Sequence, residues 1–301
     1  MKKIKADNIT WIDIKDPKQA DIEYLEKNYK IHPLILGELI PPSQRSKVEE
    51  VGGFIYIVLY FPVFNKEKRE TKIREIDIVV GNNLVVTSHY KPIIPIKELF
   101  NRYHLYEDLR NQQMTGAGIL LYKIIDNMLS HTLPKLDNIA KKIDRVEEEI
   151  FKGQEKEMLT EISLLKRDIL NMSKAIKPQN RLLRSLNLIA PKFFGKECRI
   201  YFHDLLGSHD YVREILKNHE AMIDSLATTN ESLLSHKLND IVRVLTVVSF
   251  IALPLTLAAS VLGMNMPIGF LNSEQAFWGV VIIMAVMALS TTLYFKKKEW
   301  L

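Results

Sequence analysis

Polar side chains recur along one side of an apolar segment near the end of the sequence. They stand at alternating steps of three and four residues, a spacing that places them on one face of a helix. The face comprises Thr246, Ser249, Leu253, Thr256 and Ser260, and its backward extension adds Leu245, Val242 and Asn239. Oxygen-bearing side chains lined up in this way can contact the water shell of a cation, but small and hydroxyl residues on one face are equally typical of helix packing in a membrane. The face alone leaves both interpretations open.

The elements that position this face are predicted to cross a membrane. Residues 244–295 contain no Lys or Arg and one acidic residue, Glu274. Within them, residues 244–262 and 277–295 each form an uncharged segment of about 19 residues, which is long enough to span a hydrocarbon core of about 30 Å. Buried core helices of a soluble protein are the alternative, but two such lengths without a charge are rare in soluble folds. We therefore expect a membrane domain over residues 241–301.

Basic residues flank the two spans on the same side. Arg243 precedes the first span and Lys296, Lys297 and Lys298 follow the second, whereas the loop between the spans has neither Lys nor Arg. By the positive-inside rule, this distribution predicts a multi-pass protein of the cell membrane with both termini in the cytoplasm. Aromatic residues at the span ends fit interfacial belts: Phe277, Trp278, Tyr294, Phe295 and Trp300.

The part of the chain before the spans is rich in charge. The lone Cys198 cannot form an intramolecular disulfide, and residues 1–24 are studded with Lys, Asp and Glu, so no apolar leader is expected. The net charge of +5 is scattered and forms no basic stripe, which argues against a nucleic-acid partner. No glycine-rich loop followed by Lys-Ser or Lys-Thr is present, so no nucleotide is expected either.

Residues 1–115 have the pattern of an α/β domain. Runs rich in β-branched and aromatic residues predict strands over residues 10–14, 54–64 and 76–88, and Gly81-Asn82-Asn83 breaks the last run as a hairpin turn would. Residues 21–40 have helical apolar spacing that stops at Pro41-Pro42.

Residues 116–240 change to a helical pattern. Two heptad seams lie on either side of Lys152-Gly153-Gln154, which predicts an antiparallel helical hairpin with charged, solvated outer faces. A third run begins near Tyr201, and past Gly207 no Gly or Pro interrupts it before Pro254, so one helix is expected to continue into the first span. Its seam contains His209, His219 and Asn230, which are expected to set register or oligomeric state.

The polar face ends at Gly263-Met264-Asn265, and this arrangement resembles the signature of the CorA family of magnesium channels. The tripeptide stands at the end of the penultimate span and is followed by a short loop, a last span and a lysine-rich tail. The resemblance covers essentially the whole chain. It implies an α/β cytoplasmic domain, a long-helix stalk and two C-terminal transmembrane helices in a funnel-shaped homopentamer, and a transporter rather than an enzyme.

The resemblance also assigns roles to residues. Family members place five first spans around the pore, which implies that the polar face lines it. The implied pore-lining residues are Asn239, Val242, Leu245, Ser249, Leu253 and Thr256, and the implied selectivity filter is Gly263, Met264 and Asn265. Magnesium gives up its water reluctantly, so a ring of Asn265 amides could hold the hydrated ion by outer-sphere contacts. Rings of Leu245 and Leu253 are candidates for apolar constrictions that close by dewetting.

One departure concerns the loop after the tripeptide. Many family members continue with an aromatic residue and a Met-Pro-Glu-Leu stretch, whereas this chain reads Met266-Pro267-Ile268-Gly269-Phe270. The acid of that stretch is missing at its usual place, and Glu274 is a candidate substitute. The departure puts the identity of the ion in doubt more than the fold.

Control by cytoplasmic magnesium is a further implication. In the family, ions bound by carboxylates between subunits hold the closed state, and Asp204 in Tyr201-Phe202-His203-Asp204 resembles the ligand on the stalk helix. Its partner in the next subunit is not identifiable, and an ordinary exposed carboxylate is the alternative. A structural zinc site is not expected, since no His pair stands at i, i+4 and Cys198 has no second cysteine nearby.

These expectations amount to passive, membrane-potential-driven uptake of hydrated Mg²⁺. Transport of Co²⁺, Ni²⁺ or Zn²⁺ through the same architecture is the nearest alternative, because these ions share the coordination geometry. A membrane-anchored coiled-coil scaffold that conducts nothing is the alternative of a different class. The ordered polar face argues against it, and ion flux discriminates the two.

Overall fold

The computed structural model spans residues 1–301 and describes all of them except residues 44, 66–69, 265–273, 299 and 301. The chain divides into two compact units, Met1–Ala227 and Thr228–Leu301. The boundaries expected after residues 115 and 240 remain predictions.

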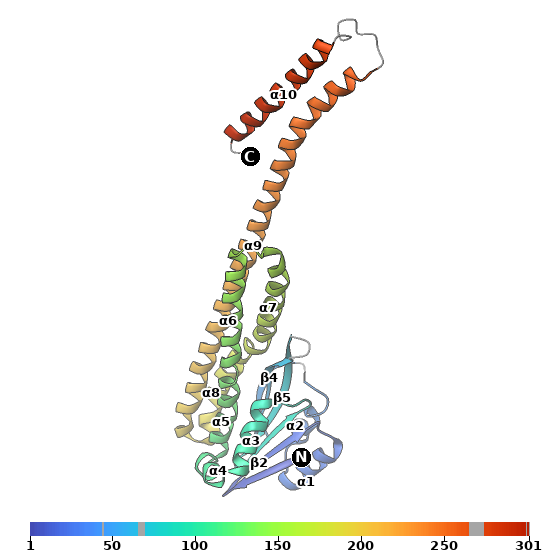
Figure 1. Ribbon diagram of the computed structural model, residues 1–301. Helices are drawn as coiled ribbons and strands as arrows, with labels where there is room; N and C mark the ends of the chain where they lie inside the picture. Colours follow the sequence, from blue (N-terminus) through green and yellow to red (C-terminus); the bar gives the residue numbers. More distant parts are fainter. Residues whose placement is uncertain (44, 66–69, 265–273, 299, 301) are drawn as a thin grey trace. The chain divides into compact units, whose positions relative to one another are not determined.

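A mixed sheet forms the base of the N-terminal unit (Figure 1). Over the described residues it has six strands: β1 (Lys2–Ala6), β2 (Ile9–Lys15), β3 (Lys47–Val51), β4 (Phe54–Asn65), β5 (Glu70–Val80) and β6 (Leu84–His89). The order is β1-β2-β6-β5-β4-β3, in which β2 and β6 run parallel and all other neighbours antiparallel. The predicted hairpin is confirmed, since Gly81 donates its backbone N–H to the carbonyl of Leu84 at 2.8 Å.

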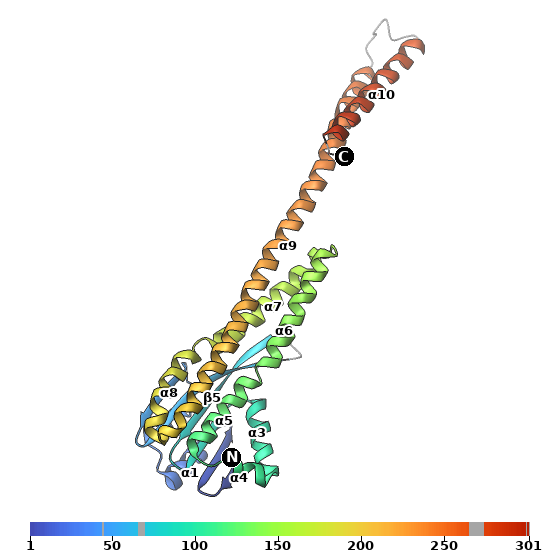
Figure 2. The same ribbon diagram turned by 90° about the vertical axis from the view of Figure 1, so that its left-hand side faces the viewer.

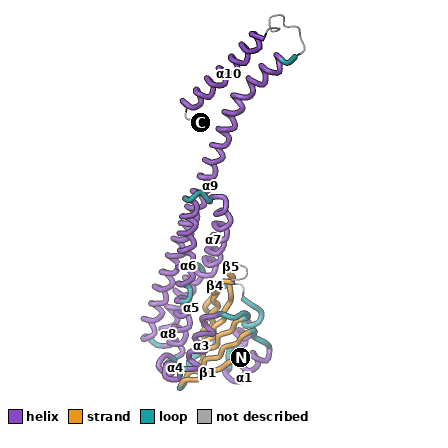
Figure 3. The backbone as a smooth tube through the Cα atoms, viewed as in Figure 1, coloured by secondary structure: helices purple, strands orange, loops and turns teal. Residues whose placement is uncertain are grey.

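Helices cover both faces of the sheet (Figure 3). Both faces need cover because successive side chains of β4 point to opposite sides of the sheet. Ile55, Ile57 and Leu59 enter one core, while Tyr56 and Val58 enter the other. The first core is shared with α3 (Ile94–Leu105), α5 (Ala117–Ser130) and α8 (Gln179–Phe194), and α4 (Glu107–Gln113) connects α3 to α5. The second core is shared with α1 (Gln19–Tyr29) and α2 (Pro33–Glu38).

Three expectations for this region need correction. The helix predicted over residues 21–40 is two helices, because Lys30 adopts the left-handed conformation (φ 53°) and Pro33 begins a new helix. The strand predicted from residue 76 begins at Glu70. Strands β1 and β3 were not expected, since each is short and rich in charged residues.

The predicted helical hairpin is confirmed as α6 (Leu133–Phe151) and α7 (Glu155–Ile176). The seam residues are buried, with Met158 half-buried: Leu136, Ile139, Ile143, Val146, Ile150, Ile162, Leu165, Ile169, Met172 and Ile176. The charged side chains of the hairpin lie largely on the outside, as a solvated face requires.

One long helix follows a short 3₁₀ turn, η1 (Lys196–Cys198). This helix, α9 (Arg199–Leu262), has 64 residues and includes Pro254, which confirms that a single helix passes from the charged region into the first span (Figure 2). Its first turns close the core of the N-terminal unit with Phe202 and Leu205. His209 is buried on the same face, and its Nε2 lies 2.9 Å from the carbonyl oxygen of Ile176 on α7. His209 of the predicted polar seam thus ties α9 to the hairpin.

Candidate functional site

The C-terminal unit consists of the end of α9 and the last helix, α10 (Glu274–Lys297). The apolar side chains of both are largely exposed to the surroundings, with Leu253 68% and Ile283 68% exposed. Core helices of a soluble protein bury such side chains, so this exposure is what two membrane spans require.

Helix α10 packs on one side of α9. Val247 of α9 is 1% exposed, and the rings of Phe250 and Phe295 lie 5.9 Å apart. These contacts define the face of α9 that its own chain covers.

The polar face of α9 points away from that contact. At about 100° per residue, Leu245, Ser249 and Thr256 lie within about 40° of the direction opposite Val247. Val242 and Leu245 are 59% and 64% exposed. Packing against α10 therefore does not account for the polar face, and within the described chain this face stays open.

Three of the four hydroxyl groups of the face are satisfied within α9 itself. Thr246, Ser249 and Thr256 each donate to the carbonyl four residues earlier, at 2.7, 2.9 and 2.8 Å. Each oxygen keeps lone pairs that can accept a hydrogen bond from a water molecule. These three side chains can meet either lipid or water without leaving a donor unpaired.

The expected filter begins where α9 ends. Gly263 donates to the carbonyl of Ala259 at 2.9 Å, and a Cβ at Gly263 would stand 3.2 Å from that same oxygen. The lack of a side chain at Gly263 thus lets the last turn close tightly. The side chain of the next residue, Met264, is 57% exposed. Asn265 lies outside the described residues, as does the loop that departs from the family pattern.

Asp204 lies on α9 in the N-terminal unit and is exposed. Its carboxylate accepts a 3.0 Å hydrogen bond from the Tyr122 hydroxyl on α5, and the Tyr122 ring lies 5.2 Å from that of Tyr201. Burial raises the pKa of the nearby Asp126, Lys123 opposes this rise, and the charge of Asp204 adds to it. The structure therefore brings two carboxylates together on neighbouring helices.

Tyr122 and Asp126 were missed from the sequence. They stand one helical turn apart on α5, and the hydrogen bond to Asp204 bridges 82 residues. No spacing signal could have linked them, because only the packing of α5 against α9 makes them neighbours. Across the described part of the chain, no group of three or more His, Cys, Asp or Glu side chains is placed to hold a metal ion.

Comparisons with known proteins cover nearly all of the sequence. The family model described as "CorA-like Mg2+ transporter protein" matches residues 6–297. The cobalt/magnesium transport protein CorA of Thermotoga maritima is 29% identical over 97% of this chain and 83% of its own length. The zinc transport protein ZntB of Yersinia pseudotuberculosis is 20% identical over 97% of this chain and 88% of its own length.

A solved structure agrees with the fold. The complete structure of the CorA magnesium transporter from Methanocaldococcus jannaschii covers 100% of this chain, with 95% of that chain matched, a TM-score of 0.86 and 24% identity. A continuous stalk helix that enters a two-helix membrane segment defines a class of membrane-embedded metal-ion transporters. The chain belongs to the CorA-like Mg²⁺ transporter family, whose members are divalent-cation transporters and not enzymes.

Proposed function

We propose that five copies of this chain surround a pore with their first spans and carry hydrated Mg²⁺ passively into the cell. The observation that carries the proposal is the polar face of α9, which points away from α10 and is covered by nothing in the described chain. A symmetric ring of copies would bury this face around a central path, as closed oligomers bury identical surfaces. The loop between the spans has neither Lys nor Arg, whereas Arg243 and three lysines flank the other ends of the spans, which supports a topology with both termini in the cytoplasm.

The chemistry of the face suits a hydrated ion. The hydroxyl donors of Thr246, Ser249 and Thr256 are already paired with backbone carbonyls, so their oxygens offer acceptor sites to the waters around the ion. Such outer-sphere contacts leave the ion's water shell in place, which favours Mg²⁺ because it dehydrates reluctantly. Gly263, Met264 and a ring of Asn265 amides would form the filter at the outer mouth.

The membrane potential supplies the driving force. It offers about 2.3 kcal/mol per charge per 100 mV, and about twice that for a divalent ion. The pore needs no nucleotide hydrolysis for inward transport.

Internal Mg²⁺ closes the pore in this proposal. Each chain contributes Asp204 and Asp126 to a regulatory site, and the remaining ligands come from water and from the adjacent copy. Two carboxylates and several waters fit the way proteins hold Mg²⁺. Release of the ion would loosen neighbouring copies and shift the population toward the open state.

Proteoliposomes test the proposal directly. Purified protein is reconstituted with a trapped Mg²⁺ indicator, and uptake is followed with and without an inside-negative potassium diffusion potential. We expect the rate of Mg²⁺ uptake to rise with the potential and to be independent of added nucleotide. Vesicles that stay impermeable to Mg²⁺, Co²⁺, Ni²⁺ and Zn²⁺ under both conditions would favour the non-conducting scaffold.

Transport of another divalent ion is the second candidate. The similarity to a zinc transport protein and the missing acid in the loop after Asn265 both favour testing it. Competition between ions in the same vesicles ranks their affinities for the pore. If a low concentration of Zn²⁺ inhibits Mg²⁺ uptake and Zn²⁺ accumulates in the vesicles, the transported ion is Zn²⁺ and not Mg²⁺.

A further inference from the structure

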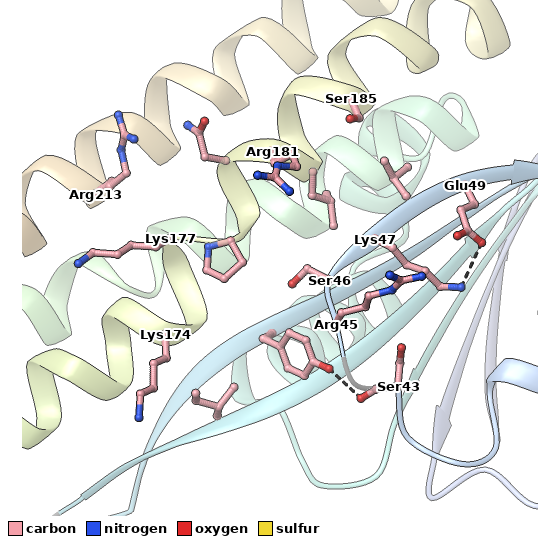
Figure 4. A pocket seen from close by; sticks show the side chains of 16 residues that line it. Ser43, Arg45, Ser46, Lys47, Glu49, Lys174, Lys177, Arg181, Ser185 and Arg213 are labelled. Carbon is pink, nitrogen blue, oxygen red and sulfur yellow. Dashed lines mark hydrogen bonds and ion pairs between the residues drawn. The ribbon is translucent and has the colours of Figure 1, made fainter.

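A basic pocket lies on the N-terminal unit, on the side of the sheet edge formed by β3 (Figure 4). Its volume is about 1200 Å³. The walls come from the segment after α2, from β4 and β5, from the end of α7 and the start of α8, and from α9. Gln179 fixes the α8 wall, because its side chain donates to the Tyr60 carbonyl at 2.6 Å.

The pocket is strongly positive. Six basic residues line it against one acidic residue, Glu49: Arg45, Lys47, Lys174, Lys177, Arg181 and Arg213. Clusters of like charge repel one another and raise the free energy of the folded chain unless an opposite charge compensates them. The excess therefore indicates an anionic ligand.

Half of these cations already have carboxylate partners. Lys47 pairs with Glu38 and Glu49, Lys177 pairs with Glu220 at 3.0 Å, and Arg213 pairs with Asp210 at 3.2 Å. Over the residues that the structure describes, Arg45, Lys174 and Arg181 have no carboxylate within ion-pair distance. These three cations remain available to a ligand.

The three cations come from different elements around the pocket. Figure 4 shows Arg181 on α8 and Arg45 beside Ser46 on the facing segment, whereas Lys174 extends away from them at the end of α7. The Ser46 hydroxyl oxygen is buried and has no hydrogen-bond partner among the described residues. A buried hydroxyl without a partner costs free energy, and a ligand oxygen in the pocket would satisfy it.

We propose that this pocket binds a polyphosphate anion, either an inorganic chain or the phosphate tail of a nucleotide. Two guanidinium groups and an ammonium group spread over a wide cavity match several phosphates in a row, since guanidinium binds phosphate oxygens in a bidentate manner. A single carboxylate carries one negative charge against three cations, whereas tripolyphosphate carries several along its chain. The ligand would link the segment at residues 45–49 to α7, α8 and α9. The inference concerns binding to the N-terminal unit and does not depend on conduction through the pore.

The sequence carries no phosphate-binding motif, and the structure explains why none was needed. Arg45 and Arg181 are separated by more than half of the N-terminal unit along the chain, and folding alone brings them to one cavity. The expectation that no nucleotide binds rested on the lack of a glycine-rich loop, which this kind of site does not use.

Calorimetric titration tests the proposal on the full chain in detergent micelles. The buffer contains EDTA, so that no metal bridges ligand and protein, and about 150 mM salt to screen weak surface attraction. The probes are inorganic tripolyphosphate, adenosine triphosphate, orthophosphate and a hexaglutamate peptide. We expect tripolyphosphate to bind, orthophosphate to bind at least about tenfold more weakly, and Arg181→Glu or Arg45→Glu to weaken tripolyphosphate about tenfold or more.

Matched variants make the outcome decisive. Arg145→Glu changes the net charge equally at an exposed position of α6 outside the pocket, and it should leave the affinity unchanged. Ser46→Ala keeps every charge and should still weaken binding a few-fold, while Arg181→Lys should retain more affinity than Arg181→Glu. Tighter binding of adenosine triphosphate than of tripolyphosphate assigns the site to nucleotides, and equal binding assigns it to the phosphate chain.

Three results would overturn the inference. They are the absence of tripolyphosphate binding to the wild-type chain, equal loss of affinity in Arg145→Glu and Arg181→Glu, and hexaglutamate binding as tight as tripolyphosphate. The first result would show that the pocket binds no polyphosphate. The second would show that binding depends only on the net charge of the surface. The third would show that the pocket does not select phosphate over carboxylate. Hydrogen exchange provides a second readout, in which tripolyphosphate should slow exchange at residues 45–49 and in the first turns of α8 while α10 stays unchanged.

Discussion

Asn265 is the residue on which the proposed ion selectivity depends. An uncharged amide ring holds a hydrated divalent ion loosely enough for it to leave, whereas a carboxylate ring would bind it more tightly. The residue two positions before it, Gly263, ends α9 with a 2.9 Å hydrogen bond to the carbonyl of Ala259.

Asn265→Ala should abolish selective Mg²⁺ uptake, lowering the rate by about tenfold or more, because it removes the outermost amides. Proteoliposome flux measures the rate, and size-exclusion chromatography checks that assembly is intact. Uptake at the wild-type rate would refute the filter assignment. Asn239→Ala, which changes an amide at the other end of the same face, provides the comparison.

Asp77 is an acidic residue buried in the sheet. It is 1% exposed, and its carboxylate accepts a 3.0 Å hydrogen bond from the Tyr56 hydroxyl. Burial raises the pKa of Asp77 to about 8, and the charge of Glu75 adds to the rise. In the unfolded chain the same carboxyl has its ordinary pKa of about 3.9.

The stability of the N-terminal unit should therefore fall as the pH rises from about 4 to about 8. Within this window the folded chain binds a proton that the unfolded chain has lost, so the free energy of unfolding declines by up to about 1.4 kcal/mol per pH unit. Asp77→Asn should flatten this dependence. Thermal unfolding followed by the fluorescence of the buried Trp11 measures it, and parallel pH profiles for the two chains would contradict the assignment.

At the scale of elements, α9 divides its surface between two tasks. Val247 and Phe250 meet α10, and the opposite face carries the polar residues. Leu253 stands on that open face and is 68% exposed, so it is free to form an apolar ring among copies.

Leu253→Asp should keep the pore wetted and conducting at high internal Mg²⁺, because a carboxylate ring removes the apolar constriction. Patch recordings at low and at millimolar internal Mg²⁺ provide the test. Val248→Asp lies about 140° around the same helix from Leu253 and is 54% exposed, so it serves as a control for the added charge. If closure is unchanged in Leu253→Asp, this leucine is not part of the gate.

The elements also show how far the sequence could predict the structure. Long periodic segments were predictable, since burial of Ile143 and Ile169 follows directly from their heptad positions. Strand β1 was not, because only Ile4 and Ala6 of its five residues are buried and three lysines mask the alternation. The break between α1 and α2 had a signal in His32-Pro33, which the helical spacing on either side obscured.

The candidate site divides in the same way. The polar face and the tripeptide after it were predictable because they lie in one continuous stretch of sequence. The contact of Asp204 with Tyr122 and the meeting of Arg45 with Arg181 depend on packing between distant segments. A single sequence has no periodicity that reports such pairs.

At the scale of the whole molecule, the regulatory proposal couples an ion in the N-terminal unit to the state of the pore. Asp204→Lys would place a positive charge where the ion binds, so the response to added Mg²⁺ must shrink whether the lysine mimics or repels the ion. We expect protease protection of α9 to lose most of its dependence on Mg²⁺ up to millimolar concentration. Tyr122→Phe removes the hydrogen bond but keeps the carboxylate, and it should retain the response.

Equal protection curves for Asp204→Lys and the wild-type chain would show that Asp204 is ordinary surface charge. The sensing ions would then bind elsewhere. Uptake measured on the same preparations separates this outcome from a failure of conduction, because a pore can pass ions without sensing them.

The closure of the N-terminal core by Phe202 and Leu205 has a consequence for biosynthesis. Every residue of that core has left the ribosome's catalytic centre before the first apolar span is made, since the core ends near residue 205 and the span begins near residue 244. Translation proceeds at about 5–20 residues per second, so the remaining chain takes several seconds, which is long compared with the folding of a mixed α/β domain. We therefore expect much of the N-terminal core to fold before the membrane machinery receives the two spans. In the proposed orientation, it has to move only the short connection between two hydrophobic helices across the bilayer.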